Sequence, residues 1–382
     1  MLPINADTAK LVGRVWRKDV QGPSVVLLRG GQIIDVSARY PTMTDLLNAD
    51  VAAQFDTLAG EDLGPLGGFV HAPTAMRHGS DQSCLLAPCD LQAIKACGVT
   101  FASSMIERVI DERTQGDPAK ANLIRTRIGE LIGGNLSSIK AGSEAAKSVK
   151  RALESEGLWS QYLEVGIGPD AEVFTKSQPM SAVGYGAEVG VNPISNWSNP
   201  EPEIVMVVDG AGLIRGAALG NDVNLRDVEG RSALLLGKAK DNNAACAVGP
   251  FIRLFDDTFT IRDIETAQLS MKVTGTDGFQ ISGASNMSEI SRSPADLVGQ
   301  TCNANHQYPD GFMLFTGTMF APTQDRGAPG SGFTHKHGDV VEISTPLLGT
   351  LSNTVTGSDK AAPWRFGLRA LMGNLAARGL LA

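Results

Sequence analysis

Short apolar runs separated by Gly, Pro and Asn make up most of the chain beyond Ala171. Runs of this length, bounded by turn residues, predict β-strands over residues 204–208, 213–219, 259–264, 268–273, 313–316 and 340–343. Two helices are predicted outside these strands, a mostly polar one over residues 140–156 and an amphipathic one within residues 363–381. Strands that follow one another in this way favour a sheet-rich α+β domain over alternating βαβ units.

Residues 1–85 are predicted to form a small N-terminal β-rich domain, and residues 86–382 a second, larger domain. Strands are expected over residues 13–16, 24–28 and 32–36, with a turn at Gly30-Gly31 and a short helix beginning at Met43. A Gly- and Pro-rich stretch at residues 64–79 indicates the linker between the domains.

The larger domain is expected to begin with a helix and a strand. Asp90 is a typical N-cap residue, which predicts a helix over residues 91–95 that ends at Gly98. Residues 98–102 then predict a short strand, followed by a longer helix to about residue 113.

Charge and composition narrow the classes of partner. The formal net charge is −8 and no long basic run is present, which argues against nucleic acid or an anionic membrane surface. No apolar stretch approaches the roughly 18 residues of a membrane span. The first residues lack the basic start and apolar core of a secretory signal, and the five cysteines are scattered, so we expect a cytoplasmic protein with reduced thiols.

Three carboxylates are the candidate chemistry of this chain. Glu201 and Glu203 stand two residues apart, so both point to one face of a strand. A hairpin turn at Asp209-Gly210 would return Asp222 toward them. Carboxylates placed in this way repel one another, and a hard divalent cation such as Mg²⁺ removes the repulsion. A solvated acidic edge strand is the alternative that the spacing leaves open.

Around these carboxylates the sequence resembles the fumarylacetoacetate hydrolase family. That family carries Glu-x-Glu followed by an Asn-Asp-Val/Trp-Ser-x-Arg-Asp run, matched here by Glu201-Pro202-Glu203 and Asn221-Asp222-Val223-Asn224-Leu225-Arg226-Asp227. Further motifs match in order, namely Phe174-Thr175-Lys176, Lys240 ahead of Gly249-Pro250, Gly317-Thr318 and Gly338-Asp339-Val340. The likeness covers about residues 86–360, and several ordered motifs are more specific than any one of them.

The resemblance implies a fold, a metal and a set of site residues. The fold would be a mixed β-sheet roll or sandwich of the family's C-terminal type, assembled as a homodimer or homotetramer. The metal would be Mg²⁺, with Mn²⁺ or Ca²⁺ as substitutes, held by Glu201, Glu203 and Asp222. The implied substrate contacts come from Lys176, Thr318, Ser103 and Ser104.

One departure from the family pattern bears on the reaction. The hydrolases carry a metal-binding Asp and a catalytic His after their first strand, whereas alignment on the paired serines puts Thr100 and Glu107 there. Without the His, the activation of water for C–C hydrolysis is in doubt. Glu107 and Lys240 are the remaining candidates for an acid/base pair, with their roles open, and Lys240 can equally be a counter-charge.

The likeness is greatest to the branch that dehydrates 2-keto-3-deoxy sugar acids. It implies a hydro-lyase that converts a 2-keto-3-deoxy-pentonate, of the D-xylonate or D-arabinonate type, to 2,5-dioxopentanoate. The C3 proton would leave to give a metal-stabilised enolate, and the C4 hydroxyl would follow. The alternatives are a hydrolase of acylpyruvates or other 2,4-diketo acids, an oxaloacetate-type decarboxylase, and a binding protein without turnover.

Overall fold

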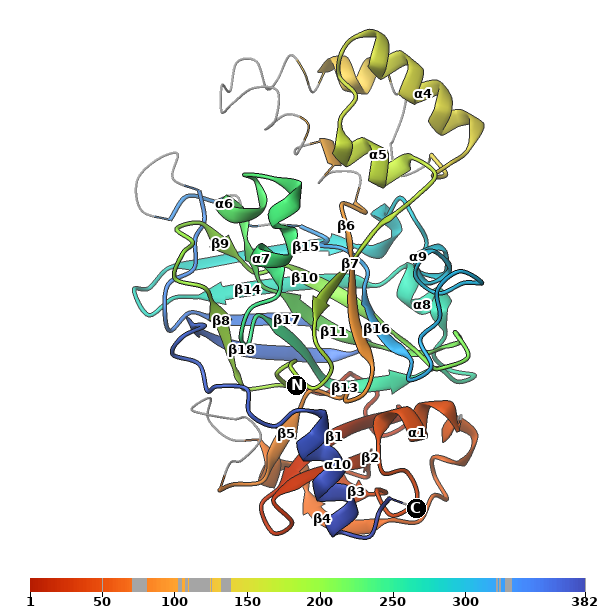
Figure 1. Ribbon diagram of the computed structural model, residues 1–382, viewed down its shortest axis with the longest axis vertical. Coiled ribbons are helices and arrows are strands. Elements are labelled where there is room, and N and C mark those ends of the chain that lie inside the picture. Colours follow the sequence, from red (N-terminus) through yellow and green to blue (C-terminus); the bar gives the residue numbers. More distant parts are fainter. Residues whose placement is uncertain are drawn as a thin grey trace.

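A large mixed β-sheet runs through the molecule from the N-terminal strands toward the helices of residues 144–167 at the opposite end (Figure 1). The computed structural model describes residues 1–49, 51–70, 81–101, 105–106, 109, 124, 126–131, 139–320, 322, 324–326 and 332–381. The strand order is β4–β3–β2–β1–β13–β11–β10–β16–β6–β7, with β5 paired to β1. The strands span β1 (Leu11–Arg17), β2 (Gly22–Arg29), β3 (Gln32–Asp35), β4 (Glu61–Pro65), β5 (Cys84–Leu86), β6 (Ala93–Gly98), β7 (Glu172–Ser177), β10 (Pro202–Val208), β11 (Ile214–Asp222), β13 (Cys246–Leu254) and β16 (Phe312–Phe315).

A second sheet of five strands packs against the centre of the large one. Its order is β15–β14–β17–β18–β8, and its strands span β8 (Glu188–Val191), β14 (Gln268–Thr274), β15 (Gln280–Asn286), β17 (Val340–Thr345) and β18 (Gly349–Gly357). Met206 and Leu219 of the large sheet share one buried core with Leu269, Ile343 and Leu351 of the small one. Strand β14 alternates buried and exposed residues, as expected for a sheet with one face toward a core. The result is the predicted α+β sandwich.

The opposite face of the central strands is covered by the N-terminal region. Val205 and Val207 of β10 share a core with residues of α1 (Met43–Asn48). Because both faces of β10 are covered, all seven of its residues are buried, unlike those of β14. The strand that follows Glu201 is therefore held rigidly from both sides.

The remaining helices are short and lie at the edges of the sheets. They span α4 (Glu144–Ser155), α5 (Gln161–Ile167), α6 (Arg226–Glu229), α7 (Leu236–Lys240), α8 (Ile261–Glu265), α9 (Pro294–Thr301) and α10 (Leu368–Ala377). Single turns of 3₁₀-helix occur at Val51–Gln54, Leu66–Phe69, Ala233–Leu235 and Met287–Glu289, and a two-stranded ribbon joins β9 (Ser198–Asn199) to β12 (Asn224–Leu225). Helices α4 and α5 form a separate tier with their own small core, at the top of Figure 1.

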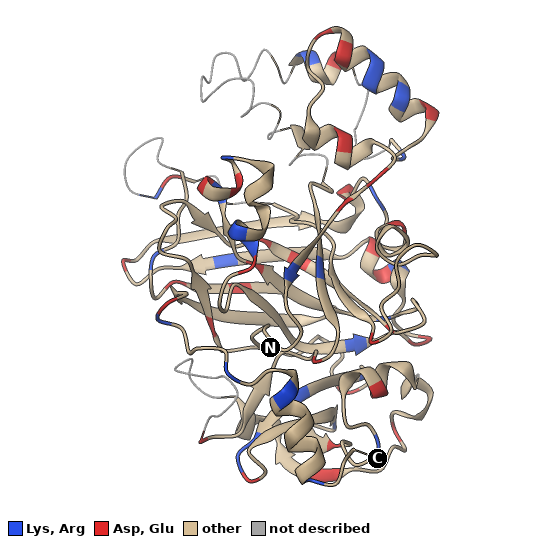
Figure 2. Ribbon diagram, in the orientation of Figure 1, with Lys and Arg blue, Asp and Glu red and all other residues tan. Residues whose placement is uncertain are grey.

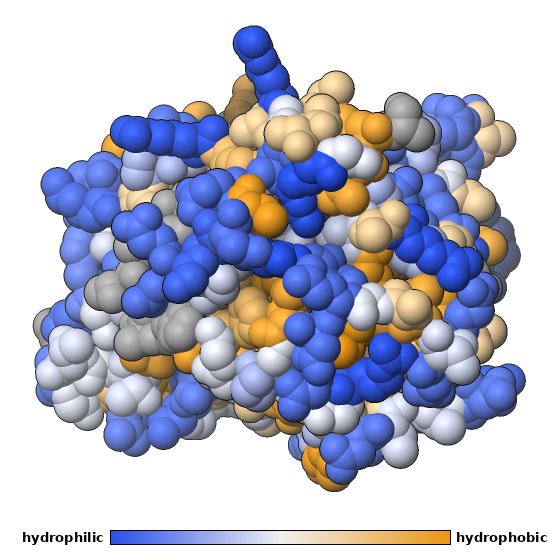
Figure 3. All heavy atoms as spheres, turned by 90° about the horizontal axis from the view of Figure 1, so that it is seen from below, coloured by the Kyte–Doolittle hydropathy of each residue, from blue (hydrophilic) through white to orange (hydrophobic). Residues whose placement is uncertain are grey.

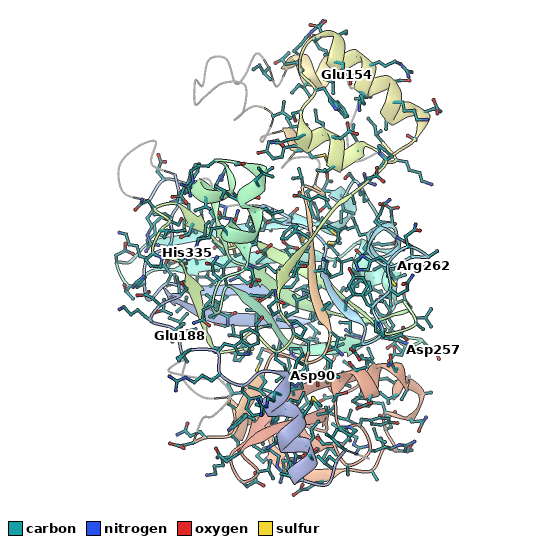
Figure 4. The ribbon with its side chains drawn as sticks, viewed as in Figure 1. Asp90, Glu154, Glu188, Asp257, Arg262 and His335 are labelled. Atoms are coloured by element: carbon teal, nitrogen blue, oxygen red, sulfur yellow. The ribbon has the colours of Figure 1, made fainter. Side chains whose placement is uncertain are left out.

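The N-terminal region is tied to the rest of the chain in two ways. Strand β1 continues the large sheet through pairing of Leu11 with Arg253, and the C-terminal helix α10 docks on the loop after β1, where Asn374 Nδ2 donates to the carbonyl oxygen of Val20 at 2.9 Å. Asp90 lies where this region meets the sandwich (Figure 4). The domain boundary at residue 85 stays a prediction, and β5 runs across it.

Most of the predicted N-terminal elements are confirmed. Strands β1 to β3 and the Gly30-Gly31 turn lie where the pattern places them, and both glycines have positive φ angles, 59° and 77°. Thr42 caps α1 through a reciprocal pair of hydrogen bonds with Asp45. The polar helix at residues 140–156 is found as α4, and the amphipathic helix as α10.

Two elements predicted just after Asp90 are wrong. Residues 91–95 were predicted to be helical and residues 98–102 to be a strand, whereas β6 spans Ala93–Gly98 and Val99, with φ of 51°, follows it. Asp90 does not begin a helix of its own; its Oδ2 accepts from the backbone N–H of Met43, the first residue of α1, at 2.8 Å. Pairing with β16 overrides the weak local helix signal.

The strand predicted over residues 259–264 is also wrong, because α8 occupies most of it. Thr260 and Asp263 form a capping box at its start: the Thr260 N–H donates to the Asp263 carboxylate at 2.7 Å. This Thr-x-x-Asp spacing is visible in the sequence and is the signal that the apolar pattern obscured.

Charges of both signs are interspersed over the ribbon, and Figure 2 shows no extended basic face in its view. The end of the molecule seen in Figure 3 is mainly hydrophilic, with small hydrophobic areas between polar residues. Within the described ranges, no helix combines the length and the apolarity that crossing a membrane requires.

The close packing of the central strands yields a first prediction. A Cβ at Gly220 would lie 2.3 Å from Phe315 Cε1 and 2.6 Å from Val205 Cγ2, with both faces of the sheet covered. We expect Gly220→Ala to lower the free energy of unfolding by about 1–3 kcal/mol, because overpacked cores must shift to admit a methyl group.

The matched control is Gly373→Ala in α10, where a Cβ meets nothing within 4 Å. An alanine there should stabilise the helix by roughly 0.5–1 kcal/mol. Chemical denaturation of both variants checks the pair, and an unchanged or raised stability for Gly220→Ala contradicts the packing described.

Candidate active site

The hairpin of β10 and β11 brings three carboxylates together. Glu201 precedes β10, Glu203 lies within it and Asp222 ends β11, and one carboxylate oxygen from each lies within 4.8 Å of the others. All three side chains are buried. The Asp222 N–H donates to the carbonyl oxygen of Glu201 at 3.0 Å, so the backbone holds the two ends of the hairpin in register.

Two buried lysines face this cluster. Lys240, at the end of α7, places Nζ 2.5 Å from Glu201 Oε2 and 3.0 Å from Asp222 Oδ2. Lys176, from β7, places Nζ 2.8 Å from Asp222 Oδ1 and also donates to the carbonyl oxygens of Lys240 and Val223. Lys176 therefore ties Asp222 to the end of α7.

Glu203 is held from another direction, by the segment that follows β16. The Gly317 N–H donates to Glu203 Oε2 at 2.7 Å. Gly317 has φ of 100°, and a Cβ there would lie 2.1 Å from Thr100 Oγ1, so glycine is required for this close approach. Thr100 Oγ1 in turn donates to the Thr316 carbonyl oxygen at 2.6 Å, which fixes the chain just after β6 beside the cluster.

Burial and mutual repulsion dominate the electrostatics. Burial, together with the charges of Asp222 and Glu201, raises the pKa of Glu203 well above its ordinary value of 4.5. Burial likewise raises the pKa of Glu201, although the nearby Lys240 ammonium opposes this. For Lys240, burial alone would lower the pKa, but the carboxylates of Asp222 and Glu201 outweigh it and raise the pKa. Lys240 therefore stays protonated at neutral pH.

The donor set fits a hard divalent cation. Once all three carboxylates are ionised, they exceed the charge of the two ammonium groups, and negative charge buried without compensation is costly. Oxygen ligands of this kind suit Mg²⁺, Mn²⁺ or Ca²⁺. Glu201, Glu203 and Asp222 are the residues that could hold such an ion.

Of the other predicted site residues, Thr318 alone lies among those that the structure describes. Thr318, beside the Gly317 that binds Glu203, is half-buried, and its hydroxyl donates to the Phe320 carbonyl oxygen at 3.0 Å. Ser103, Ser104 and Glu107 lie outside the described residues. Their roles stay predictions.

Two residues that bear on the cluster were not singled out from the sequence. Asn224 Nδ2 donates to Glu201 Oε1 at 2.9 Å and to Glu229 Oε2 at 2.7 Å. Asn224 lies inside a motif quoted above, so its position was a usable signal. No sequence pattern indicated Glu229, because the fold of α6 is what brings it to Asn224.

Comparison with known proteins identifies the family of the chain. The model of the fumarylacetoacetate (FAA) hydrolase C-terminal family matches residues 139–356, more than half of the chain. Two curated relatives are similar in sequence. A probable 2-keto-3-deoxyxylonate dehydratase of Haloferax volcanii is 33% identical over 53% of this chain and 66% of the relative's length. The 2-dehydro-3-deoxy-D-arabinonate dehydratase of Saccharolobus solfataricus is 32% identical over 48% of this chain and 58% of the relative's length. The chain thus matches less than two thirds of the length of each relative.

Solved structures share the fold along most of the chain. A 2-keto-3-deoxy-D-arabinonate dehydratase described as complexed with magnesium and 2,5-dioxopentanoate superposes with a TM-score of 0.62 at 20% identity, covering 91% of this chain and 99% of its own. A fumarylacetoacetate hydrolase from Exiguobacterium antarcticum superposes with a TM-score of 0.56 at 14% identity, covering 91% and 99%. The chain belongs to the fumarylacetoacetate hydrolase family.

Proposed function

We propose that this protein is a metal-dependent dehydratase that removes water from a 2-keto-3-deoxy-pentonate of the D-xylonate or D-arabinonate type to give 2,5-dioxopentanoate. The observation that carries the proposal is the buried cluster of Glu201, Glu203 and Asp222 with Lys240 against it. The names of the two relatives, and the magnesium and 2,5-dioxopentanoate of the solved neighbour, support this substrate class.

Glu201, Glu203 and Asp222 are the proposed ligands of one Mg²⁺, for which Mn²⁺ or Ca²⁺ can substitute. When bound, the ion supplies Lewis-acid polarisation of the 2-keto acid, which makes the neighbouring C3 protons more acidic. The groups around the cluster prepare this site, since the Gly317 N–H fixes one oxygen of Glu203 and the Lys240 side chain fixes one oxygen of Glu201. Pre-orientation of this kind lowers the cost of assembling the site when substrate arrives.

Lys240 is proposed to act as a charged hydrogen-bond donor. Its raised pKa makes it a poor base, because the two carboxylates beside it stabilise the ammonium form. A protonated amine at this place can stabilise negative charge that develops on a substrate oxygen. The removal and return of a proton then fall to Glu107, so that Glu107 and Lys240 form the proposed catalytic pair, with Lys240 as the charged donor.

The proposed substrate contacts come from the rim of the cluster. Thr318 and the segment around Ser103 and Ser104 are candidates for the carboxylate and hydroxyl groups of the sugar acid. Lys176 was predicted as a further contact; its three observed partners belong to the chain, so we propose that it acts on the substrate through Asp222 and Lys240. A homodimer or homotetramer remains the proposed assembly.

A product assay tests the reaction. We expect metal-stripped protein to convert 2-keto-3-deoxy-D-pentonate, the single compound that D-xylonate and D-arabinonate both give because C4 is its only stereocentre, or its C4 enantiomer, to a product lighter by one water only when Mg²⁺ is added. Lys240→Met should lower kcat by roughly 10²–10³-fold, the usual cost of removing a donor that stabilises developing negative charge. Mass spectrometry of the reaction mixture gives both answers.

Lys272→Met, an exposed lysine on β14, is the control and should keep full activity. Parallel reactions with an acylpyruvate and with oxaloacetate separate the alternatives. Cleavage of the former or CO₂ release from the latter, without loss of water from either pentonate, would overturn the dehydratase proposal in favour of a hydrolase or a decarboxylase.

The raised pKa of Glu203 predicts that the stability of the metal-stripped protein depends on pH. Because the pKa of Glu203 is raised in the folded protein, the unfolded chain loses this proton first as the pH rises above about 4.5. The folded state then binds more protons than the unfolded state, so ionisation of Glu203 lowers the free energy of unfolding across that window. Metal-stripped Glu203→Gln should therefore melt at a higher temperature than wild type at pH 7, with the difference disappearing near pH 4.5.

Thermal unfolding from pH 4.5 to 8 measures this difference, and added Mg²⁺ should reverse its sign by stabilising wild type more. Glu154→Gln on the exposed face of α4 (Figure 4) is the matched control and should shift nothing. A metal-stripped Glu203→Gln variant that is less stable than wild type at pH 7 would show that Glu203 is compensated without a metal.

A further inference from the structure

Asn224 connects the carboxylate cluster to a fourth acidic residue. Its side chain is fully buried on β12, and its single NH₂ group donates one hydrogen bond to Glu201 Oε1 at 2.9 Å and one to Glu229 Oε2 at 2.7 Å. Glu229 is half-buried at the end of α6. Both lengths are within the normal range of N–H···O hydrogen bonds, so the two carboxylates together hold the amide.

The orientation of this amide is dictated by the carboxylates. With NH₂ facing Glu201 and Glu229, the Oδ1 atom is buried without a hydrogen-bond partner among the described residues. A flipped amide would satisfy neither carboxylate, because an oxygen cannot donate. An unsatisfied buried acceptor costs free energy. The two N–H hydrogen bonds to the carboxylates therefore outweigh the free-energy cost of the unsatisfied Oδ1 atom.

An amide at this position can do what a hydroxyl cannot. A serine hydroxyl carries one hydrogen and can donate to one carboxylate at a time, whereas the amide carries two. The link from Glu201 to Glu229 thus requires the residue found in this chain.

The consequence for Glu201 is that both of its oxygens are held. Oε2 receives Lys240 Nζ and Oε1 receives Asn224 Nδ2, from two different elements of the fold. A carboxylate fixed at both oxygens keeps one orientation of its plane. Groups that orient a metal ligand in this way typically contribute 10–100-fold to metal affinity.

We propose that Asn224 is a positioning residue that fixes the Glu201 carboxylate for metal binding, and that Glu229 holds Asn224 in the orientation this requires. The inference rests on the proposed metal site but not on the identity of the substrate. Asn224 and Glu229 act through Glu201 and need not touch the substrate. The prediction is that the chain binds a divalent cation more tightly than it would with a serine at this position.

Calorimetric titration of the metal-stripped full-length protein with Mg²⁺, without substrate, tests this. We expect Asn224→Ser to weaken Mg²⁺ binding by roughly 10–100-fold. Asn353→Ser is the matched control: Asn353 is also buried and donates twice, to the carbonyl oxygens of Gly184 and Ala187, but on β18. It should lower stability without changing the Mg²⁺ Kd.

A double-variant cycle separates the role of Glu229. If Glu229 acts through Asn224, Asn224→Ser combined with Glu229→Ala should lose less affinity than the product of the two single losses. Independent, multiplicative losses would overturn the role given to Glu229, and an unchanged Kd in Asn224→Ser would overturn the role given to Asn224. Absence of Mg²⁺ binding by wild type would instead overturn the proposed metal site itself.

Discussion

The repulsion among three buried carboxylates is the constraint around which the rest of this site is arranged. Glu201, Glu203 and Asp222 lie within a few ångströms of one another in an environment that raises the pKa of both glutamates. Lys240 and Lys176 offset part of this charge. A bound cation would offset the remaining negative charge. The proposed function therefore rests on the cluster as a whole rather than on any single residue.

The fold makes the constraint tolerable by fixing the backbone from which the carboxylates project. Strand β10 is covered on one face by the five-stranded sheet and on the other by the N-terminal region, so the hairpin cannot relax outward. The segment at Gly317 approaches closely because that residue has no side chain. The N-terminal region, far from the carboxylates in sequence, thus contributes to the site through the rigidity of the central strands.

The parts that the sequence could predict are those governed by local periodicity. Glu201 and Glu203 share a face because strands repeat every two residues, and Asp222 returns because the turn at Asp209-Gly210 closes a hairpin. Strand β6 could not be predicted, since its pairing with β16 joins segments more than two hundred residues apart and overrides a helical start at Asp90. The Asn224–Glu229 contact depends on the path of α6, which no short-range pattern contains.

The most direct test of this account is equilibrium dialysis of the metal-stripped protein against Mn²⁺, comparing wild type with Asp222→Asn. This substitution keeps the shape of the side chain and removes one of the three charges. We expect one tightly bound ion per wild-type chain and its loss in the variant. Wild-type protein that binds no ion, or a variant that binds as tightly as wild type, would contradict the assignment of Glu201, Glu203 and Asp222 as a metal centre.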